Sequence, residues 1–203
     1  TMLSAMIVGP PGKVIAAEPS SANLKKLKRN VKVNGFSQVR VIEAAVSDHT
    51  NGADFFINPD GNGGHALWDV SKQKSIEVVR TITLDSLDLS SVRLIKIDTE
   101  GHENRILAGV KNLLSSQARP PFIVAELHPQ GLGNFGDNQF TLRHLMESHG
   151  YLSFLLFNDT PFPVYVPSGT QINTAYVLNL LFARPEFMHE FYPVIQIAEK
   201  GKT

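Results

Sequence analysis

The sequence predicts a doubly wound α/β fold with a mostly parallel sheet, an antiparallel edge and a small β-hairpin insertion. Short apolar runs alternate along the chain with segments whose apolar residues repeat at helical spacing, and glycine or proline bounds most runs. The 203 residues are 42% apolar and 19% charged, as in an ordinary globular protein. We therefore expect one domain over residues 1–203.

The first 46 residues predict the end of a helix, a strand, a second helix and a second strand. The opening helix ends at the Gly-Pro-Pro-Gly run of 9–12, and a short apolar strand covers 13–17. Ser20 can cap the next helix with its hydroxyl, and the Asn-Gly pair at 34–35 ends that helix. The second strand covers 39–46.

The middle of the chain interrupts this alternation. Residues 55–57 and 66–68 flank a glycine-rich turn at 61–64, a pattern typical of a β-hairpin. Residues 77–84 alternate in polarity and add another short strand. We expect these strands to be antiparallel additions at one edge of the sheet.

Regular alternation resumes at residue 92. The expected strands are 92–97, 122–127, 151–157 and 175–183, and the expected helices are 102–116 and 139–149. Alternation of this kind is typical of a sheet that helices cover on both faces.

Composition excludes several classes of function. The chain has 19 basic and 19 acidic side chains, so it carries no basic field for nucleic acid. It has no cysteine, and no apolar run reaches the roughly 18 residues that a membrane helix needs. We expect a cytoplasmic protein with no nucleic-acid or membrane partner, and we leave a homo-oligomer open.

Three predicted strands are followed by, or end near, a carboxylate: Glu18, Asp98 and Glu126. In open α/β sheets, ligands bind beyond the carboxyl ends of the strands. Each carboxylate alone is often a helix cap or a solvated loop residue, but three together indicate a site. Glu18 has a further specific role available, because an acidic residue at this point of a nucleotide-binding fold accepts hydrogen bonds from ribose hydroxyls.

The densest group of polar residues is the segment IKIDTEGHE at 95–103. His102 is either a general base, because histidine titrates near neutral pH, or a surface residue at a helix start. Asp98, Glu100 and His102 resemble a metal cluster by composition. Residues that alternate at a strand end point in different directions, so we expect no metal site.

Four segments, in this order, resemble the FkbM-type methyltransferase family: GKVIAAEPSSANLKKLKRNVKVNG, TLDSL, LIKIDTEGHENRILAG and PFIVAELHP. The resemblance covers most of residues 2–183, and DTEGHE is its most specific part. It implies a Rossmann-like domain that transfers a methyl group from S-adenosylmethionine, usually to an oxygen of a small molecule or sugar.

The resemblance also implies roles for single residues. Glu18, with Pro19 and Ser20, would bind the ribose of the cofactor, and Asp98 would lie near its methionine end. The residues that would border the adenine are Ala44, Ala45 and Val46. The candidates for the base that accepts the proton of the methyl acceptor are Asp98, His102, Glu126 and His128, which we expect to line one cleft.

The family's first strand and its cofactor-binding glycine loop would lie immediately before Thr1. We therefore expect the strands that end at Glu18 and Asp98 to flank that first strand in the complete domain. Without it, we expect residues 1–203 not to bind S-adenosylmethionine.

A second glycine pattern supports a different reading. Gly131, Gly133 and Gly136 spell G-x-G-x-x-G, with Asp159 further on. A dinucleotide fingerprint needs its first glycine directly at the strand end, and three residues intervene here. We expect these glycines to form a loop over the substrate side. A nicotinamide-dependent oxidoreductase, and a binding domain that kept the fold without the cofactor, remain as alternatives.

Overall fold

The computed structural model of this protein describes residues 1–57, 66–67, 75–115, 119–157, 160 and 162–190. The predicted turn at 61–64, residue 68 of the predicted hairpin and Asp159 lie outside the described residues. The chain forms two compact units, Thr1–Ser86 and Leu87–Thr203, and each is described by itself. No helix in the described parts is both long and apolar enough to cross a lipid bilayer.

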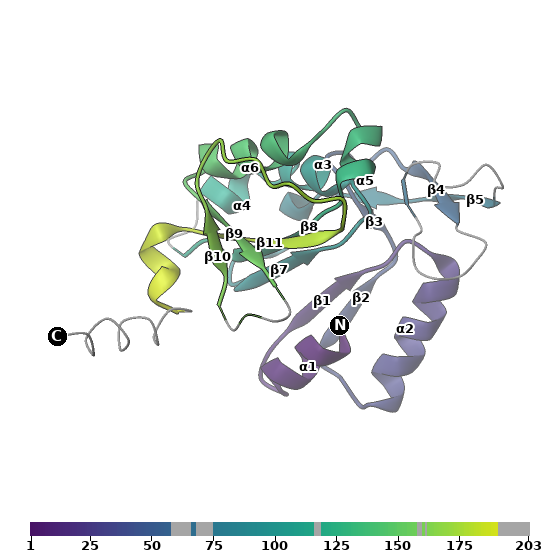
Figure 1. Cartoon of the computed structure of the whole chain (residues 1–203). Coiled ribbons are helices and arrows are strands. Elements are labelled where there is room, and N and C mark those ends of the chain that lie inside the picture. Colours follow the sequence, from purple (N-terminus) through teal and green to yellow (C-terminus); the bar gives the residue numbers. More distant parts are fainter. Residues whose placement is uncertain (58–65, 68–74, 116–118, 158–159, 161, 191–203) are drawn as a thin grey trace. The chain divides into compact units, whose positions relative to one another are not determined.

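The first unit begins with the predicted order of elements (Figure 1). They are α1 (Met2–Val8), β1 (Val14–Ala17), α2 (Ser21–Val33) and β2 (Val39–Ile42). β1 and β2 pair in parallel, with Ala17 opposite Ile42. The Ser20 hydroxyl accepts the backbone N–H of Asn23, which confirms it as the N-cap of α2.

The predicted strand 39–46 is in fact two strands with different partners. After β2, the chain turns into β3 (Ala45–Val46), which pairs in parallel with β6 (Thr81–Ile82). β4 (Ala53–Ile57) pairs antiparallel over five residues with β5 (Ser75–Val79). Of the predicted hairpin partner, Ala66 makes only an isolated bridge to Phe56. An apolar run predicts a strand, but it carries no signal for where the strand changes partner.

The second unit contains a five-stranded sheet in the order β10-β9-β11-β8-β7. The strands are β7 (Leu94–Ile97), β8 (Phe122–Leu127), β9 (Leu152–Leu156), β10 (Val164–Val166) and β11 (Leu178–Ala183). Only β7 and β8 pair in parallel, and the other three pairings are antiparallel. The sheet is mixed, so the expectation of a mostly parallel sheet is wrong for this unit. The described residues between β9, β10 and β11 form no helix, and a parallel return would need such a crossover.

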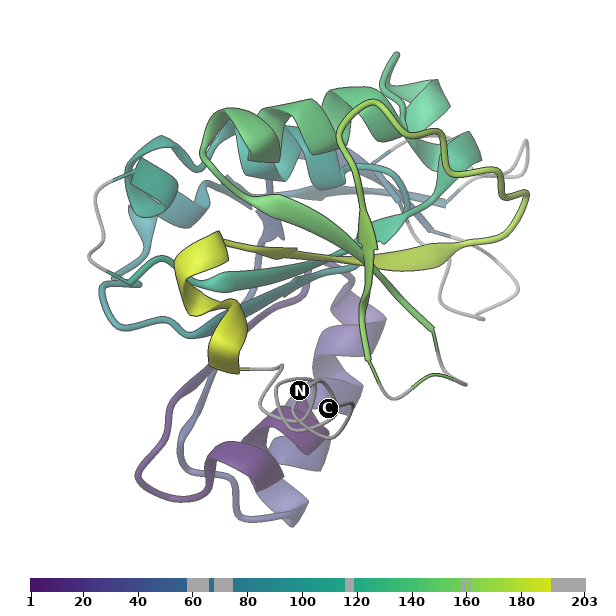
Figure 2. The same cartoon turned by 60° about the vertical axis from the view of Figure 1, so that its left-hand side comes forward.

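The helices of the second unit lie on one face of this sheet in both views (Figures 1 and 2). They are α3 (Glu103–Ala108), α4 (Lys111–Ser115), α5 (Pro129–Asn134) and α6 (Gln139–Ser148). The predicted helix 102–116 is therefore broken near Gly109, and α5 lies where a loop was expected. Among the described residues of this unit, α-helices cover one face rather than two.

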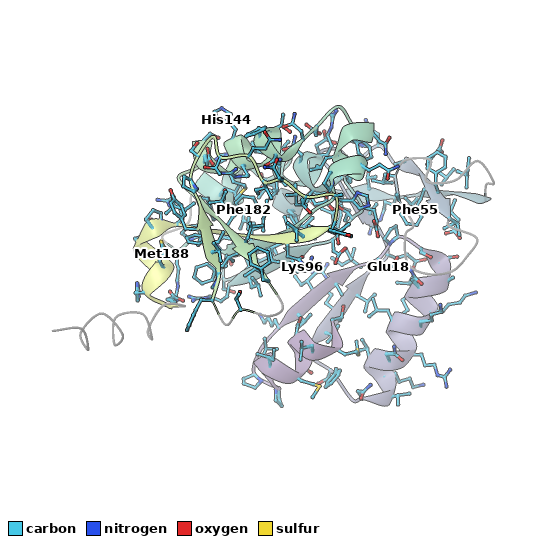
Figure 3. All side chains as sticks on the ribbon, viewed as in Figure 1. Glu18, Phe55, Lys96, His144, Phe182 and Met188 are labelled. Atoms are coloured by element: carbon cyan, nitrogen blue, oxygen red, sulfur yellow. The ribbon has the colours of Figure 1, made fainter. Side chains whose placement is uncertain are left out.

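The core of the second unit forms between this helical layer and the sheet. The strands contribute alternate residues such as Ile123, Ala125 and Phe182, and α6 contributes Leu142 and Met146; all are fully buried (Figure 3). Alternate residues of a strand point to opposite faces, so Glu126 faces away from the side that Ala125 and Leu127 occupy. This alternation fixes which side chains are available at the strand ends.

β1 and β7 each have an unpaired edge among the described strands. Among the described strands, β1 pairs only with β2 and β7 pairs only with β8. Each edge presents backbone donors and acceptors that another strand can pair. The expectation that these two strands flank a further strand stays a prediction.

Candidate active site

Glu18 directly follows β1 and is held in a short, defined turn. Its backbone N–H donates to the carbonyl of Ile42 at 3.0 Å, which extends the pairing of β1 and β2 by one residue. Its carboxylate Oε1 accepts the backbone N–H of Ser20 at 2.9 Å. The side chain stays partly exposed at the carboxyl edge of β1 (Figure 3).

The predicted adenine neighbours lie at the same edge of this small sheet. Ala44 and Ala45 follow β2, which is the parallel neighbour of β1. Both are almost fully buried, whereas Val46 is partly exposed. The first unit therefore brings together the residues implied for binding the ribose and the adenine. The two alanines have little exposed surface.

In the second unit, Asp98 and Glu126 lie at the carboxyl ends of the two parallel strands. Ile97 and Ala125 stand opposite each other in β7 and β8. Asp98 and Glu126, which follow them, therefore lie at corresponding positions of the two strands. The Asp98 carboxylate is 3.1 Å from the Lys96 ammonium, and its side chain is 54% exposed. Asp98 is thus an open, charge-paired group.

Glu126 has a different environment. It is partly buried, and its Oε2 is buried with no hydrogen-bond partner among the described residues. Burial raises the pKa of Glu126 to about 7, and the negative charges of Asp98, Glu100 and Glu103 act in the same direction. Lys96 opposes them. A carboxyl group that titrates near neutral pH is suited to accept and release a proton.

The turn after β7 is strained and held closed by Glu103. Glu100 has a positive φ of 57° and Gly101 one of 106°, so two consecutive residues adopt backbone conformations that are rare for side-chain-bearing residues. The fully buried Glu103 carboxylate accepts the backbone N–H of Thr99 at 2.8 Å and its hydroxyl at 3.0 Å. Burial raises the pKa of Glu103. The Glu103 carboxylate therefore stabilises the turn and does not face solvent.

His102 lies inside the second unit. It is only 7% exposed, and its ring packs edge-on against the Phe135 ring with centroids 4.9 Å apart. The alternative of a surface histidine is wrong. Its burial makes it a packing residue and a weak candidate for the base.

His128 caps α5. Its Nδ1 accepts the backbone N–H of Gly131 at 2.8 Å, so the proton of the neutral ring resides on Nε2. That Nε2 lies 3.5 Å from the Glu100 carboxylate. The lone pair that a base needs is already engaged, which argues against His128 as the proton acceptor.

The G-x-G-x-x-G pattern has a structural role here. Gly131 and Gly133 belong to α5, and the expected loop is a helix. The Gly131 N–H, which a bound phosphate would need, already donates to His128. Asp137, one residue after the last glycine, accepts the side-chain amide of Asn104 at 2.6 Å. This arrangement lacks the open amides of a dinucleotide fingerprint.

The residue types alone did not identify Lys96 and Asn179 as members of this site. Lys96 donates to the Asn179 side-chain oxygen at 2.9 Å. Glu100, which the sequence singled out only as part of a cluster that resembles a metal site, lies beside His128. Lys96 was detectable, because it stands two residues before Asp98 on the same face of the strand. Asn179 lies in β11, and its place beside Lys96 could be known only from the order of the strands in the sheet. Among the described residues, no three His, Asp or Glu side chains are grouped to hold a metal ion.

Two solved structures resemble this chain. The chain resembles the crystal structure of methyltransferase FkbM from Methylobacillus flagellatus with a TM-score of 0.51 and 18% identity; the match covers 84% of this chain and 36% of that one. A weaker likeness is to precorrin-6y C5,15-methyltransferase from Geobacter metallireducens, with a TM-score of 0.47 and 15% identity over 90% of this chain and 72% of that one.

The first comparison supports a Rossmann-like α/β fold, and the chain spans about a third of that protein's length. No curated protein matches the sequence. The family comparison is more decisive, because residues 1–153 match the methyltransferase FkbM domain. That match includes Glu18, Asp98 and Glu126, and this chain belongs to the FkbM methyltransferase family.

Proposed function

We propose that the protein transfers a methyl group from S-adenosylmethionine to a hydroxyl oxygen of a small molecule or sugar, with Glu126 as the base. S-adenosylmethionine supplies a methyl carbon bonded to a positively charged sulfur. Glu18, at the end of β1, is suited to accept hydrogen bonds from the ribose hydroxyls because Ser20 fixes its carboxylate. Ala44, Ala45 and Val46 would border the adenine.

The single observation that carries the choice of base is the environment of Glu126. Its Oε2 is buried without a hydrogen-bond partner among the described residues, and its pKa lies near 7. Around neutral pH the partly exposed Glu126 carboxylate can take the proton of an acceptor hydroxyl. Asp98 is paired with Lys96, His102 is packed against Phe135, and His128 caps a helix. These environments favour Glu126 over the other three candidates.

The experiment is calorimetric titration of S-adenosylmethionine and of NAD into the protein as its gene encodes it. Binding of S-adenosylmethionine and not NAD is expected. Transfer of a labelled methyl group to hydroxyl compounds then tests the reaction. Preferred binding of NAD would favour the oxidoreductase, and binding of neither nucleotide would favour the binding domain.

A further inference from the structure

We infer that a cleft between the start of α6 and the loop before β11 binds a neutral, polyhydroxylated ligand, and that this ligand is the methyl acceptor. The second part of the inference rests on the proposed function. The cleft has a volume of about 390 Å³, near the lower end of the roughly 300–1,000 Å³ typical of small-molecule sites. That volume suits one sugar ring or a molecule of similar size.

The polar side chains that line the cleft are uncharged. Four carry amides (Asn138, Gln139, Gln171 and Asn173), and Thr174 adds a hydroxyl. No described residue of the lining carries a charge at neutral pH. A side-chain amide both donates and accepts hydrogen bonds, which matches a hydroxyl group that does the same. A charged ligand would find no partner of opposite sign here.

Some of these polar groups form hydrogen bonds within the protein, and others are available to a ligand. Both polar atoms of Gln139 bond to the backbone of Ile172, and the Thr174 hydroxyl bonds to the backbone of Tyr176. The amides of Gln171 and Asn173 make no hydrogen bond to described residues, and both residues are exposed. A ligand in the cleft would form hydrogen bonds with these two amides.

The lining also offers an apolar surface. Leu127, Pro129, Phe140 and Ile172 contribute to it, and the Phe140 side chain remains 41% exposed although it is large and hydrophobic. The two faces of a sugar ring carry C–H groups while its rim carries hydroxyls, and such a ring packs favourably on an aromatic side chain. The combination of amides with one exposed aromatic ring therefore favours a sugar over an aliphatic alcohol.

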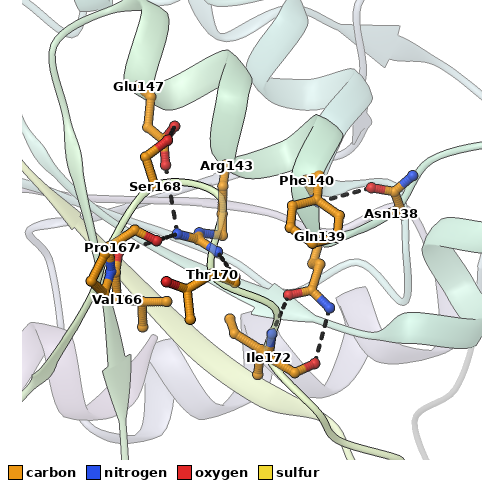
Figure 4. Close-up of polar contacts among 10 residues, drawn as sticks. All are labelled: Asn138, Gln139, Phe140, Arg143, Glu147, Val166, Pro167, Ser168, Thr170 and Ile172. Atoms are coloured by element: carbon orange, nitrogen blue, oxygen red, sulfur yellow. Dashed lines mark hydrogen bonds and ion pairs between the residues drawn. The ribbon is translucent and has the colours of Figure 1, made fainter.

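The loop side of the cleft is held in place before any ligand arrives (Figure 4). The Arg143 guanidinium on α6 donates to the carbonyls of Val166, Pro167 and Thr170 at 3.1, 2.6 and 2.6 Å. Gln139 exchanges two hydrogen bonds with Ile172, at 2.6 and 2.9 Å. A binding surface that is already ordered loses less entropy when a ligand binds.

The cleft lies beyond the carboxyl end of β8, the strand that carries Glu126. Leu127 and Pro129 line it, and they lie on either side of His128. Ligands of open α/β sheets bind at this end of the strands. The Glu126 side chain points to the opposite face of the sheet from Leu127, so a hydroxyl group of the ligand has to extend past the strand end to meet it.

The test is NMR titration of the isotope-labelled protein, without S-adenosylmethionine, with a panel of neutral sugars. The panel contains myo-inositol and the methyl glycosides of common hexoses, 6-deoxyhexoses and pentoses. At least one member should shift the backbone signals of residues 138–140 and 171–174. Absence of binding by every member, or shifts confined to other residues, would overturn the inference.

Two further sets of probes define the ligand class. Glucose 6-phosphate and glucuronate carry a charge, and cyclohexylmethanol has the size of a sugar with a single hydroxyl. Both sets should bind at least about threefold more weakly than the best neutral sugar. The charged sugars lose hydration without gaining a partner of opposite charge in the cleft, and cyclohexylmethanol lacks hydroxyl groups whose hydrogen bonds are each worth a factor of this order. Equal or tighter binding of either set would contradict a neutral, polyhydroxylated ligand.

Variants of exposed residues locate the site without disturbing the fold. Asn173→Ala, Gln171→Ala and Phe140→Ala should each weaken binding of the best sugar about threefold to tenfold. His144→Ala is the matched control, because His144 lies on the same helix as Phe140 but outside the cleft, and it is exposed (Figure 3). Its affinity should be unchanged. Unchanged affinity in all three cleft variants would remove the site.

This design separates the two proposals. Sugar binding in the cleft without any transfer from S-adenosylmethionine would preserve the site and reject the proposed function. Methyl transfer to a sugar whose KM is unchanged in the three cleft variants would preserve the function and reject the site.

Discussion

Gly101 and Gly131 pack backbone against backbone in the second unit. A Cβ atom on Gly101 would stand 2.2 Å from the carbonyl carbon of Gly131, and one on Gly131 would stand 2.5 Å from the carbonyl oxygen of Glu100. Glycine at both positions thus allows the turn after β7 to contact the start of α5. This contact joins the two strand-end segments that carry Glu100 and His128.

Substitution at this contact should destabilise the protein. Gly101→Ala adds a clash with backbone to a φ of 106° that alanine rarely adopts, so we expect a loss of about 2–4 kcal/mol in the free energy of unfolding. Gly133→Ala is the control, because a Cβ there meets nothing within 4 Å and Gly133 lies in a helix. Urea unfolding should show that control unchanged or stabilised by up to about 1 kcal/mol. Equal losses in both variants would refute the role of the close contact.

Glu18→Gln should weaken binding of S-adenosylmethionine by about 1–3 kcal/mol, the worth of a charge-assisted hydrogen bond. Fold stability should change little, since Glu18 is partly exposed at a strand end. Glu43→Gln is the control, because Glu43 follows the neighbouring strand but is exposed and paired with Lys28 at 3.2 Å. Calorimetric titration of both variants measures the difference. An unaltered affinity in Glu18→Gln would remove the ribose role.

Glu126→Gln should lower the rate of methyl transfer by about 10²–10⁴-fold, the usual contribution of a general base. Only the carboxylate can accept a proton, so the wild-type rate should rise with pH through about 7. Asp98→Asn removes one of the negative charges that raise the pKa of Glu126, and the rise should move to lower pH. A pH–rate profile that keeps its inflection in Glu126→Gln would assign the base elsewhere.

His128→Asn should keep most of the stability and activity, whereas His128→Ala should lose about 1 kcal/mol of stability. The reason is that His128 accepts the Gly131 N–H as a helix cap, and asparagine also caps helices well. Thermal unfolding and initial rates distinguish the two effects. A collapse of turnover in the stable His128→Asn variant would instead make His128 a catalytic residue.

Arg143→Lys should loosen the loop over residues 166–172. Arg143 is 2% exposed, and its planar guanidinium reaches three carbonyl groups that the point charge of a lysine cannot reach together. We expect a loss of about 2–4 kcal/mol in stability. Hydrogen exchange should show faster exchange at the backbone amides of this loop. Unchanged protection would mean that Gln139 alone holds the loop.

The sequence by itself determined the local elements and the residues that follow them. Glycine, proline and helix-capping residues predicted α2, β7, β8 and α6 within a few residues, because these signals depend on neighbours along the chain. The pattern DTEGHE and the segment after β1 also pointed to the family, which the match over residues 1–153 confirms. The carboxylates of Glu18, Asp98 and Glu126 were found from the same strand ends.

Only the tertiary structure decided the surroundings of these residues. Strand order depends on pairings between distant segments, and β11 therefore runs antiparallel inside a sheet that was expected to be mostly parallel. The same pairings bring Asn179 beside Lys96 and bury the Oε2 atom of Glu126. His102 and His128 looked equally suited to proton transfer in the sequence. Burial against Phe135 argues against His102, and the hydrogen bond from Gly131 argues against His128. The availability of a proton acceptor depends on solvent and partners rather than on residue type.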